Sequence, residues 1–166
     1  MHYEIERKYL IEMPDANFLI RQPDCRVWEI EQIYLKSEPG ETRRVRKVTE
    51  NGRETYFRTF KKRITFVTAE ENEAEISHEA YENYLKERDT DLQTVEKRRY
   101  RIPYCGHLLE IDVYPFWQKQ AVLEIELESE AESALIPEWL KIKREVTSDK
   151  RYKNVALARK IPLEDA

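Results

Sequence analysis

Acidic and basic side chains recur at every second position near the N-terminus. Glu4, Glu6 and Lys8 are separated from one another by single residues. In an extended strand successive side chains point to opposite faces, so these three share one face. Carboxylates without histidine or cysteine suit hard cations such as Mg²⁺ or Mn²⁺, and an ammonium group suits phosphate oxygens. This face therefore has the chemistry to hold a cation beside a phosphate.

The same alternation returns later in the chain, with whole segments of one charge sign. Acids alone line one face of Glu71–Ile76, Leu108–Tyr114 and Ala121–Glu128, and bases alone line one face of Thr42–Val48 and Thr94–Pro103. A sheet face in water normally mixes the signs. Like charges along a strand repel, so they require a facing strand, a metal or a ligand for compensation.

Two arrangements of these strands are possible. The charged faces could simply be solvated, with the apolar faces covering a core. The single-sign strands favour the other arrangement, a closed sheet with its charges inward and its apolar exterior covered by helices. The acids inside would be Glu4, Glu6, Glu73, Glu75, Glu110, Asp112, Glu124 and Glu126, and the bases Lys8, Arg44, Arg46, Lys61, Lys97, Arg99 and Arg101. Because buried charge is costly unless it is paired or binds a metal, such a tunnel should be wet and functional.

The composition limits the class of protein. The 166 residues favour one domain over 1–166. The net charge of −4, from 33 acids and 29 bases, lacks the basic excess of a general nucleic-acid binder. No segment approaches the roughly 18 apolar residues of a membrane span, and no signal peptide is recognisable, so we expect a cytoplasmic protein without a membrane partner. Cys25 and Cys105 are expected to be ordinary reduced thiols.

Turn signals divide the chain into short antiparallel strands with a few helices. Asn51-Gly52 predicts a type I′ hairpin, and Cys105-Gly106 joins another pair of strands. Helices are expected from the Ser77 cap to about Arg88, around 133–139 and from about 149 to 160. A further turn or helix is expected at 15–22. In the basic run 61–63 only Lys61 needs to face inward, and the aromatic residues are expected to pack in the core.

The motifs together resemble those of a known family. Glu4-Ile5-Glu6-Arg7-Lys8 resembles the ExExK signature of the CYTH superfamily, the triphosphate tunnel metalloenzymes. The remaining motifs follow in the family's order: Gln32-Ile33-Tyr34-Leu35, Arg44-Val45-Arg46, Thr59-Phe60-Lys61, Glu73-Ala74-Glu75, Lys97-Arg98-Arg99, Glu110-Ile111-Asp112, Glu124-Ile125-Glu126 and Asp149-Lys150-Arg151-Tyr152-Lys153-Asn154. The last segment resembles the opening of the family's C-terminal helix, near one tunnel mouth, although Lys150 stands where members often have proline.

The resemblance implies a fold and a set of roles. The fold would be α+β and mainly β, an eight-stranded antiparallel closed barrel with peripheral helices. Glu124 and Lys8 would be catalytic, with Glu124 orienting or deprotonating water. The phosphate-binding residues would be Lys8, Arg44, Arg46, Lys61, Lys97 and Arg99. The metal ligands would be Glu4, Glu6 and Glu126, joined by Glu110 and Asp112, while Glu73, Glu75 and Arg101 would support the site. Whether the acids Glu73, Glu75, Glu110 and Asp112 bind a second metal or fix the bases stays open.

The implied activity is metal-dependent hydrolysis of a small-molecule triphosphate with Mg²⁺ or Mn²⁺. Inorganic tripolyphosphate is the favoured substrate. Three alternatives remain: an adenylate cyclase, a thiamine or nucleoside triphosphatase, and a non-catalytic binder of polyphosphate or nucleotide. The protein would act as a monomer or homodimer.

Overall fold

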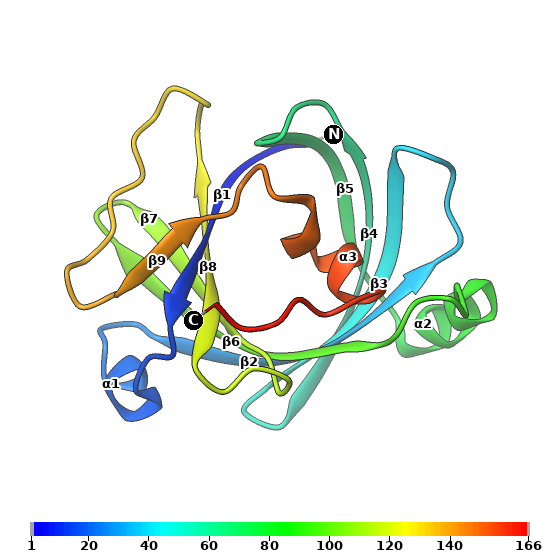
Figure 1. Ribbon diagram of the computed structural model, residues 1–166. Coiled ribbons are helices and arrows are strands. Elements are labelled where there is room, and N and C mark those ends of the chain that lie inside the picture. Colours follow the sequence, from blue (N-terminus) through cyan, green and yellow to red (C-terminus); the bar gives the residue numbers. More distant parts are fainter. Residues whose placement is uncertain (1, 166) are drawn as a thin grey trace.

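A single antiparallel sheet closes on itself to form a barrel (Figure 1). The computed structural model describes residues 2–165. The strands are β1 His2–Glu12, β2 Arg26–Leu35, β3 Glu41–Glu50, β4 Arg53–Arg63, β5 Thr68–Ile76, β6 Val95–Tyr104, β7 His107–Val113, β8 Gln120–Leu127 and β9 Ile142–Glu145. They follow the order β5-β4-β3-β2-β6-β7-β8-β1-β9, and pairing of β5 with β1 closes eight of them into a ring. The closed sheet predicted from the alternation and the eight strands implied by the resemblance are confirmed, and β9 is an additional strand on the edge of β1.

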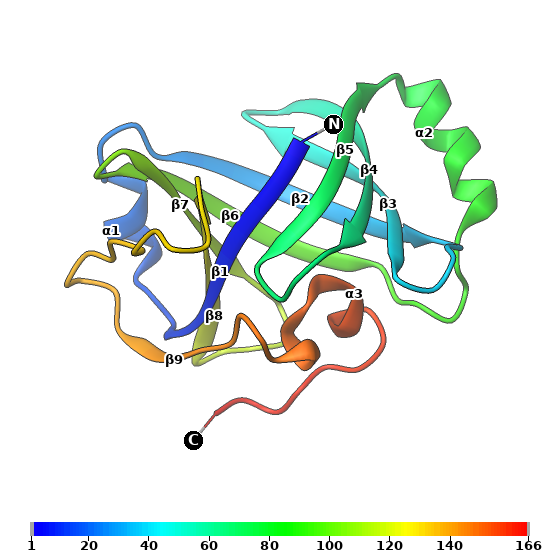
Figure 2. The ribbon, with the colours of Figure 1, turned by 90° about the horizontal axis from the view of Figure 1, so that it is seen from above.

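The barrel closes unevenly around β1. Its pairing with β8 extends from Ile5 to Glu12, whereas its pairing with β5 covers only His2 to Ile5. Beyond Ile5, β1 and β5 diverge, as Figure 2 shows. The hairpin between β3 and β4 sets the register of those two strands. Its turn residues Asn51 and Gly52 have φ values of 50° and 79°, as the type I′ turn requires.

The outer face of the barrel is apolar and is covered by short helices. Helix α1 spans Ala16–Ile20 and packs Leu19 against the outside of β6, β7 and β8. Helix α2, His78–Tyr84, starts at the Ser77 cap, continues as the 3-10 turn η1 (Leu85–Glu87), and packs Tyr81 against β2 and β3. The predicted helical cover is confirmed for these two elements. None of the helices described is long and apolar enough to cross a membrane.

Two of the expected helices differ from the structure. Residues 133–139 form turns and extended chain before β9, because Pro137 lacks a backbone donor and disfavours a helical residue before it. The helix expected over 149–160 is interrupted at Lys153, whose backbone is extended. The result is a 3-10 turn η2, Lys150–Tyr152, and a short helix α3, Asn154–Leu157.

The C-terminal segment covers one end of the barrel. Figure 1 shows α3 within the outline of the ring, and Figure 2 places it beyond the ends of the strands. Tyr152 and Leu157 pack there with Tyr34, Tyr114 and Trp117 in a buried apolar cluster. The expectation that this segment lies at a tunnel mouth agrees with the structure.

Part of the barrel interior is apolar, which the charge pattern did not predict. Ile30 of β2 lies opposite Val48 of β3, and both are 3% exposed. They share the inward face with Gln32 and Arg46, which are also register partners, and they belong to none of the outer apolar clusters. The inward face of β2 and β3 is therefore partly apolar, between the charged residues on either side of this pair.

Candidate active site

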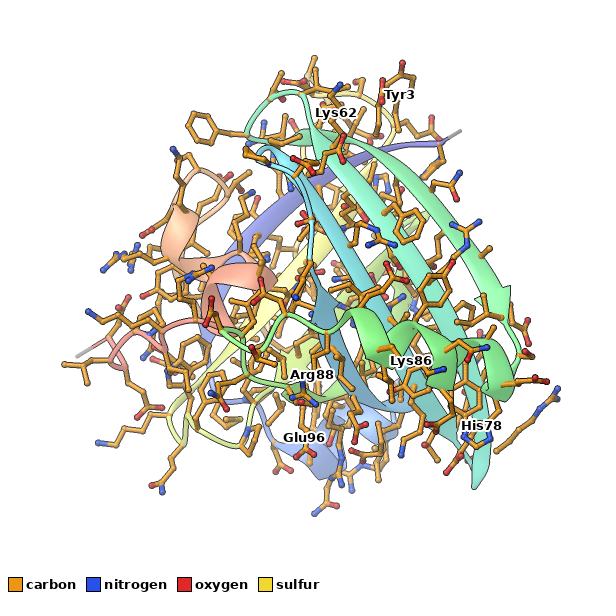
Figure 3. All side chains as sticks on the ribbon, turned by 90° about the vertical axis from the view of Figure 1, so that its right-hand side faces the viewer. Tyr3, Lys62, His78, Lys86, Arg88 and Glu96 are labelled. Atoms are coloured by element: carbon orange, nitrogen blue, oxygen red, sulfur yellow. The ribbon has the colours of Figure 1, made fainter. Side chains whose placement is uncertain are left out.

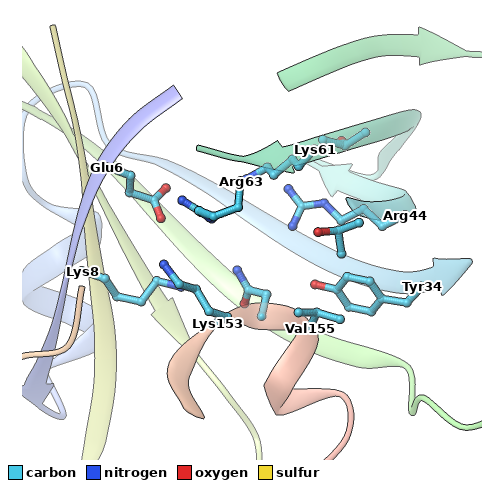
Figure 4. A pocket seen from close by; sticks show the side chains of 11 residues that line it. Glu6, Lys8, Tyr34, Arg44, Lys61, Arg63, Lys153 and Val155 are labelled. Carbon is cyan, nitrogen blue, oxygen red and sulfur yellow. The ribbon is translucent and has the colours of Figure 1, made fainter. Parts of the chain in front are cut away.

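A charged cavity lies inside the barrel beneath the C-terminal segment (Figure 4). Strands β1, β3 and β4 contribute Glu6, Lys8, Arg44 and Lys61, which the alternation predicted to face inward. The cavity lining also includes Tyr34, Thr42, Thr59, Arg63, Lys153, Asn154 and Val155. In Figure 4 the ammonium of Lys153 points toward the side chains of β1. The sheet and the C-terminal segment thus form the site together.

The acidic side of the site is formed around β1. Antiparallel register places Lys8 opposite Glu124 and Glu6 opposite Glu126. Glu4 Oε1 accepts a hydrogen bond of 2.7 Å from Lys61 Nζ. Burial opposes ionisation of Glu4, but the charge of Lys61 and the hydrogen bonds with Glu71 and Lys61 together outweigh burial and lower the pKa of Glu4 to about 2. Glu4 is therefore ionised at neutral pH.

The neighbouring carboxyl groups are short of positive charge. Burial, followed by the charges of Glu124 and Glu4, raises the pKa of Glu6 well above its usual value. Burial and Glu4 also raise the pKa of Glu71 to about 7, although Glu71 lies 3.4 Å from Lys61 Nζ. A cation placed among these carboxyl groups would relieve their repulsion.

Glu124 is a buried carboxylate held by two bases. It lies 3.3 Å from Lys8 Nζ and accepts a hydrogen bond of 3.2 Å from Arg99 Nη2. Burial opposes its charge, but Lys8 and Arg99 outweigh burial, so the pKa of Glu124 is well below its usual value. Its Oε1 has no hydrogen-bond partner within the described residues. That buried oxygen is the one that lies 3.3 Å from Lys8 Nζ, and it retains the capacity to accept a hydrogen bond.

A second group of charges neutralises itself. Arg99 donates two hydrogen bonds to Asp112, at 2.7 and 2.9 Å, and one of 3.1 Å to Glu110. Lys97 lies 2.9 Å from Asp112, and both side chains are completely buried. Similarly, Arg46 donates to Glu73 at 3.0 Å. In this structure Glu73, Glu110 and Asp112 are thus each paired with a base.

A third group of bases has no acidic partner among the residues described. Arg44, Arg63 and Lys153 form no ion pair, and the buried Nε of Arg44 has no hydrogen-bond partner. Lys153 Nζ donates to the carbonyl oxygens of Phe66 and Thr147, both at 3.2 Å. Burial and the charges of Arg63 and Lys8 lower the pKa of Lys153 to about 8. This concentration of uncompensated positive charge favours an anion.

Four of the residues predicted for the site line this cavity, and the others do not: Glu4, Arg46, Glu73, Glu75, Lys97, Arg99, Arg101, Glu110, Asp112, Glu124 and Glu126. The Glu126 side chain is 51% exposed and lies 3.0 Å from His2 Nε2. Glu75 is exposed on β5. Arg101 stacks over the ring of Trp28 at 4.0 Å and donates to Glu110 at 3.1 Å.

The donor set fits a hard divalent cation bound partly by its substrate. In the described part of the chain, no three His, Cys, Asp or Glu side chains form a ready cage for a metal. Mg²⁺ commonly uses only one or two carboxylates, with water and substrate phosphates completing its octahedron. Glu4 and Glu6, beside the unpartnered oxygen of Glu124, supply that kind of donor.

Sequence reasoning missed two basic residues of the cavity. Arg63 lies two residues after Lys61 on the same strand and points the same way, whereas Lys62 lies on the outside (Figure 3). Extending the alternation by one step would have included Arg63. Lys153 belongs to the segment that the resemblance placed near a tunnel mouth, but no role was assigned to it, because its exact position depends on the break between η2 and α3.

Comparison with known proteins gives a consistent result. The sequence model of the CYTH domain matches residues 2–161. An inorganic triphosphatase of Nitrosomonas europaea is 34% identical over 165 residues, which is 96% of this chain and 99% of that protein. A solved structure of an inorganic triphosphatase superposes with a TM-score of 0.56, at 31% identity and 98% coverage of both chains. A Hippeastrum putative adenylyl cyclase, described as having a dominant triphosphatase activity, shares the fold at 15% identity, with a TM-score of 0.53 over 76% of this chain and 80% of that one.

Proposed function

The chain belongs to the CYTH domain family, and from that premise we propose that it hydrolyses inorganic tripolyphosphate to pyrophosphate and phosphate with Mg²⁺ or Mn²⁺. The observation that carries the proposal is the juxtaposition of unpaired bases with carboxylates in one cavity of the barrel. Among the described residues, Arg44, Arg63 and Lys153 have no acidic ion-pair partner, while Glu6 faces them from β1. A polyphosphate anion with a bound cation would satisfy both sets.

The bases of the cavity would hold the substrate in line for attack. Arg44 and Arg63 can present planar guanidinium donors to phosphate oxygens, and Lys8, Lys61 and Lys153 can act as point charges. Such cationic groups stabilise the charge on the transferred phosphoryl oxygens. Because they are positioned before the substrate binds, little reorganisation accompanies the reaction.

Glu124 is the best candidate to handle the attacking water. Its pKa remains low, and its Oε1 can accept a hydrogen bond from water. The water oxygen would bond to a terminal phosphorus as the bond from phosphorus to the bridging oxygen breaks, and Glu124 would take the proton. Arg99 would hold Glu124 in position, because it donates hydrogen bonds to both Glu124 and Asp112.

The proposed cation sites are Glu4 and Glu6. A divalent ion there would neutralise phosphate charge and polarise the reacting phosphoryl group. Glu126 is a further ligand candidate from the sequence, at the exposed end of the same face. Glu110 and Asp112 were predicted as ligands as well, but their pairing with Arg99 favours a structural role.

The proposal can be tested with a substrate panel. The purified protein is incubated with tripolyphosphate, ATP or thiamine triphosphate, each with Mg²⁺, Mn²⁺ or EDTA, and phosphate and cyclic AMP are measured. We expect phosphate release to be fastest from tripolyphosphate and absent in EDTA. Cyclic AMP formation faster than phosphate release would instead identify a cyclase.

A variant separates catalysis from binding. Glu124→Gln should retain tripolyphosphate binding while losing about 10²–10⁴-fold in kcat, the usual contribution of general acid–base catalysis. Tight binding by the native protein without turnover under any metal would favour the non-catalytic binder instead.

A further inference from the structure

The chain after α3 turns back and leaves a groove between itself and the C-terminal segment. Figure 2 shows this tail, residues 158–165, running past η2 and α3 after the turn. The groove between them has a volume of about 1070 Å³, and we call it the tail groove. Its apolar lining comes from both parts and consists of Tyr152, Val155, Ala156, Ile161, Pro162 and Leu163.

The tail is held in place from its other side. Trp117 Nε1 donates a hydrogen bond of 3.0 Å to the carbonyl oxygen of Pro162. Glu164 Oε1 accepts one of 2.6 Å from the backbone of Lys119. Both anchors lie in the connection between β7 and β8. The tail therefore does not need a ligand to keep its position, and the groove is formed before anything binds.

Two apolar side chains of the tail are in contact with water at this groove. Ile161 is 46% exposed and Leu163 is 91% exposed. Single exposed apolar side chains are common on proteins, but these two line the same groove as the apolar side chains of α3. An aliphatic ligand in the groove would remove them from water, which is favourable in proportion to the apolar area covered.

The charge without a partner in the groove is positive. Arg159 and Lys160 line it, and neither forms an ion pair among the described residues. The two acids of the lining already have partners, because Glu164 accepts a backbone hydrogen bond and Asp165 accepts one of 2.8 Å from Arg144 Nε. An anionic group at the groove would therefore meet free cations beside an apolar surface.

We propose that the tail groove binds a single-chain amphipathic anion, namely an aliphatic carboxylate of medium to long chain. Its chain would lie against Val155, Ala156 and Leu163, and its carboxylate would pair with Arg159 and Lys160. The volume of the groove is of the order found for sites that enclose most of a small molecule. The proposal goes beyond triphosphate hydrolysis, because no residue of the groove is assigned a role in phosphate or metal binding.

The test is calorimetric titration of the full chain with octanoate, decanoate and dodecanoate, each below its micelle concentration. We expect one binding site per chain. The affinity should rise about fourfold for each added methylene group, the usual effect of burying one CH₂. An affinity that does not depend on chain length, or no binding of any of the three, would overturn the proposal.

Variants locate the site. Ala156→Trp fills the groove and should abolish decanoate binding. Arg159→Ala/Lys160→Ala should weaken binding about fivefold, a typical total for two exposed charge contacts. The matched control, Lys62→Ala/Lys86→Ala, removes the same charge at exposed positions outside the groove and should keep the native affinity (Figure 3). An equal loss in the control would overturn the proposal, because only net charge would then matter.

A second variant keeps the test decisive if Ala156→Trp does not fold. Leu163→Ser changes a side chain that is almost fully exposed, so it should fold normally while binding decanoate more weakly. Native affinity in this variant would overturn the proposal. Binding to anionic lipid vesicles without binding of monomeric decanoate would identify a membrane surface as the partner instead. A concentration-dependent dimer that Leu163→Ser abolishes would identify a second copy of the chain.

Discussion

Two groups of interior bases differ in how their charge is balanced. Arg99 contacts Asp112, Glu110 and Glu124, and Lys97 contacts Asp112. Arg44, by contrast, forms no ion pair among the described residues although it lies in the same barrel. The first group is balanced by its own strands. The second has no such balance among the described residues, so an inward charge does not by itself identify a substrate contact.

The two groups differ in what keeps their bases charged. Burial opposes the charge of Arg99, but Asp112 and Glu110 outweigh it, and the pKa of Arg99 is raised well above its usual value. Burial opposes the charge of Arg44 too, and the pKa of Arg44 is raised by Tyr34 and by the charges of Glu4 and Glu73, which form no ion pair with it among the described residues. We therefore expect substitutions in the balanced group to lower mainly the unfolding free energy. Substitutions in the unbalanced group should lower mainly the activity on the substrate.

The largest effect is expected for Arg99→Met. It would leave the buried Asp112 and Glu124 carboxylates with reduced compensation, and removal of one member of a buried ion pair costs about 3–5 kcal/mol. Urea denaturation measures the loss of unfolding free energy. The exposed variant Arg26→Met serves as the control, and equal stability of the two variants would contradict a structural role for Arg99.

Arg44→Met should separate activity from stability. Each lost charge-assisted hydrogen bond to phosphate costs about 1.5–3 kcal/mol, which lowers kcat/KM for tripolyphosphate by about 10- to 100-fold. The unfolding free energy should fall much less than in Arg99→Met, because Arg44 forms no ion pair among the described residues and its Nε has no hydrogen-bond partner there. Arg44→Lys should recover part of the activity, since lysine keeps the charge but loses the planar fork. A fall in unfolding free energy as large as that of Arg99→Met would show that the two groups of bases do not differ in their contribution to stability.

The sequence predicted which charged residues face inward, but not which of the bases are paired with acids. Alternation identified the strands and the inward charges, because period two is a local property of extended chain. Pairing depends on register, and register places Arg99 opposite Asp112 but Arg44 opposite Tyr34 and Thr59. Neither relationship is visible within one strand. Lys153 was missed for the same reason, since contacts with distant carbonyl groups fix its place.

Glu6→Gln tests the carboxyl groups around β1 with two measurements. One is the metal concentration required for activity, and the other is the melting temperature without metal. If Glu6 binds the cation, the concentration of Mg²⁺ or Mn²⁺ for half-maximal activity should rise about tenfold, as expected when a metal site loses one charged ligand. In EDTA the variant should melt at a higher temperature than the native protein, because repulsion from Glu4 and Glu124 is removed. An unchanged metal requirement would exclude Glu6 as a ligand. A lower melting temperature would show that a base in the protein already compensates it.

The smallest effect is expected for a balanced pair at the surface. Asp149 accepts hydrogen bonds from Arg151 and Arg144, and these lower the pKa of Asp149 to about 2. A carboxyl group whose folded-state pKa is depressed stabilises the protein fully above its unfolded value of about 4, and the contribution is lost as pH falls toward 2. Since these partners are solvent-accessible, the contribution should not exceed about 1 kcal/mol. Asp149→Asn should therefore reduce stability slightly at pH 7 and not at pH 2, as measured by urea denaturation at both values. A loss as large as that of Arg99→Met would mean that burial does not separate structural from marginal ion pairs in this barrel.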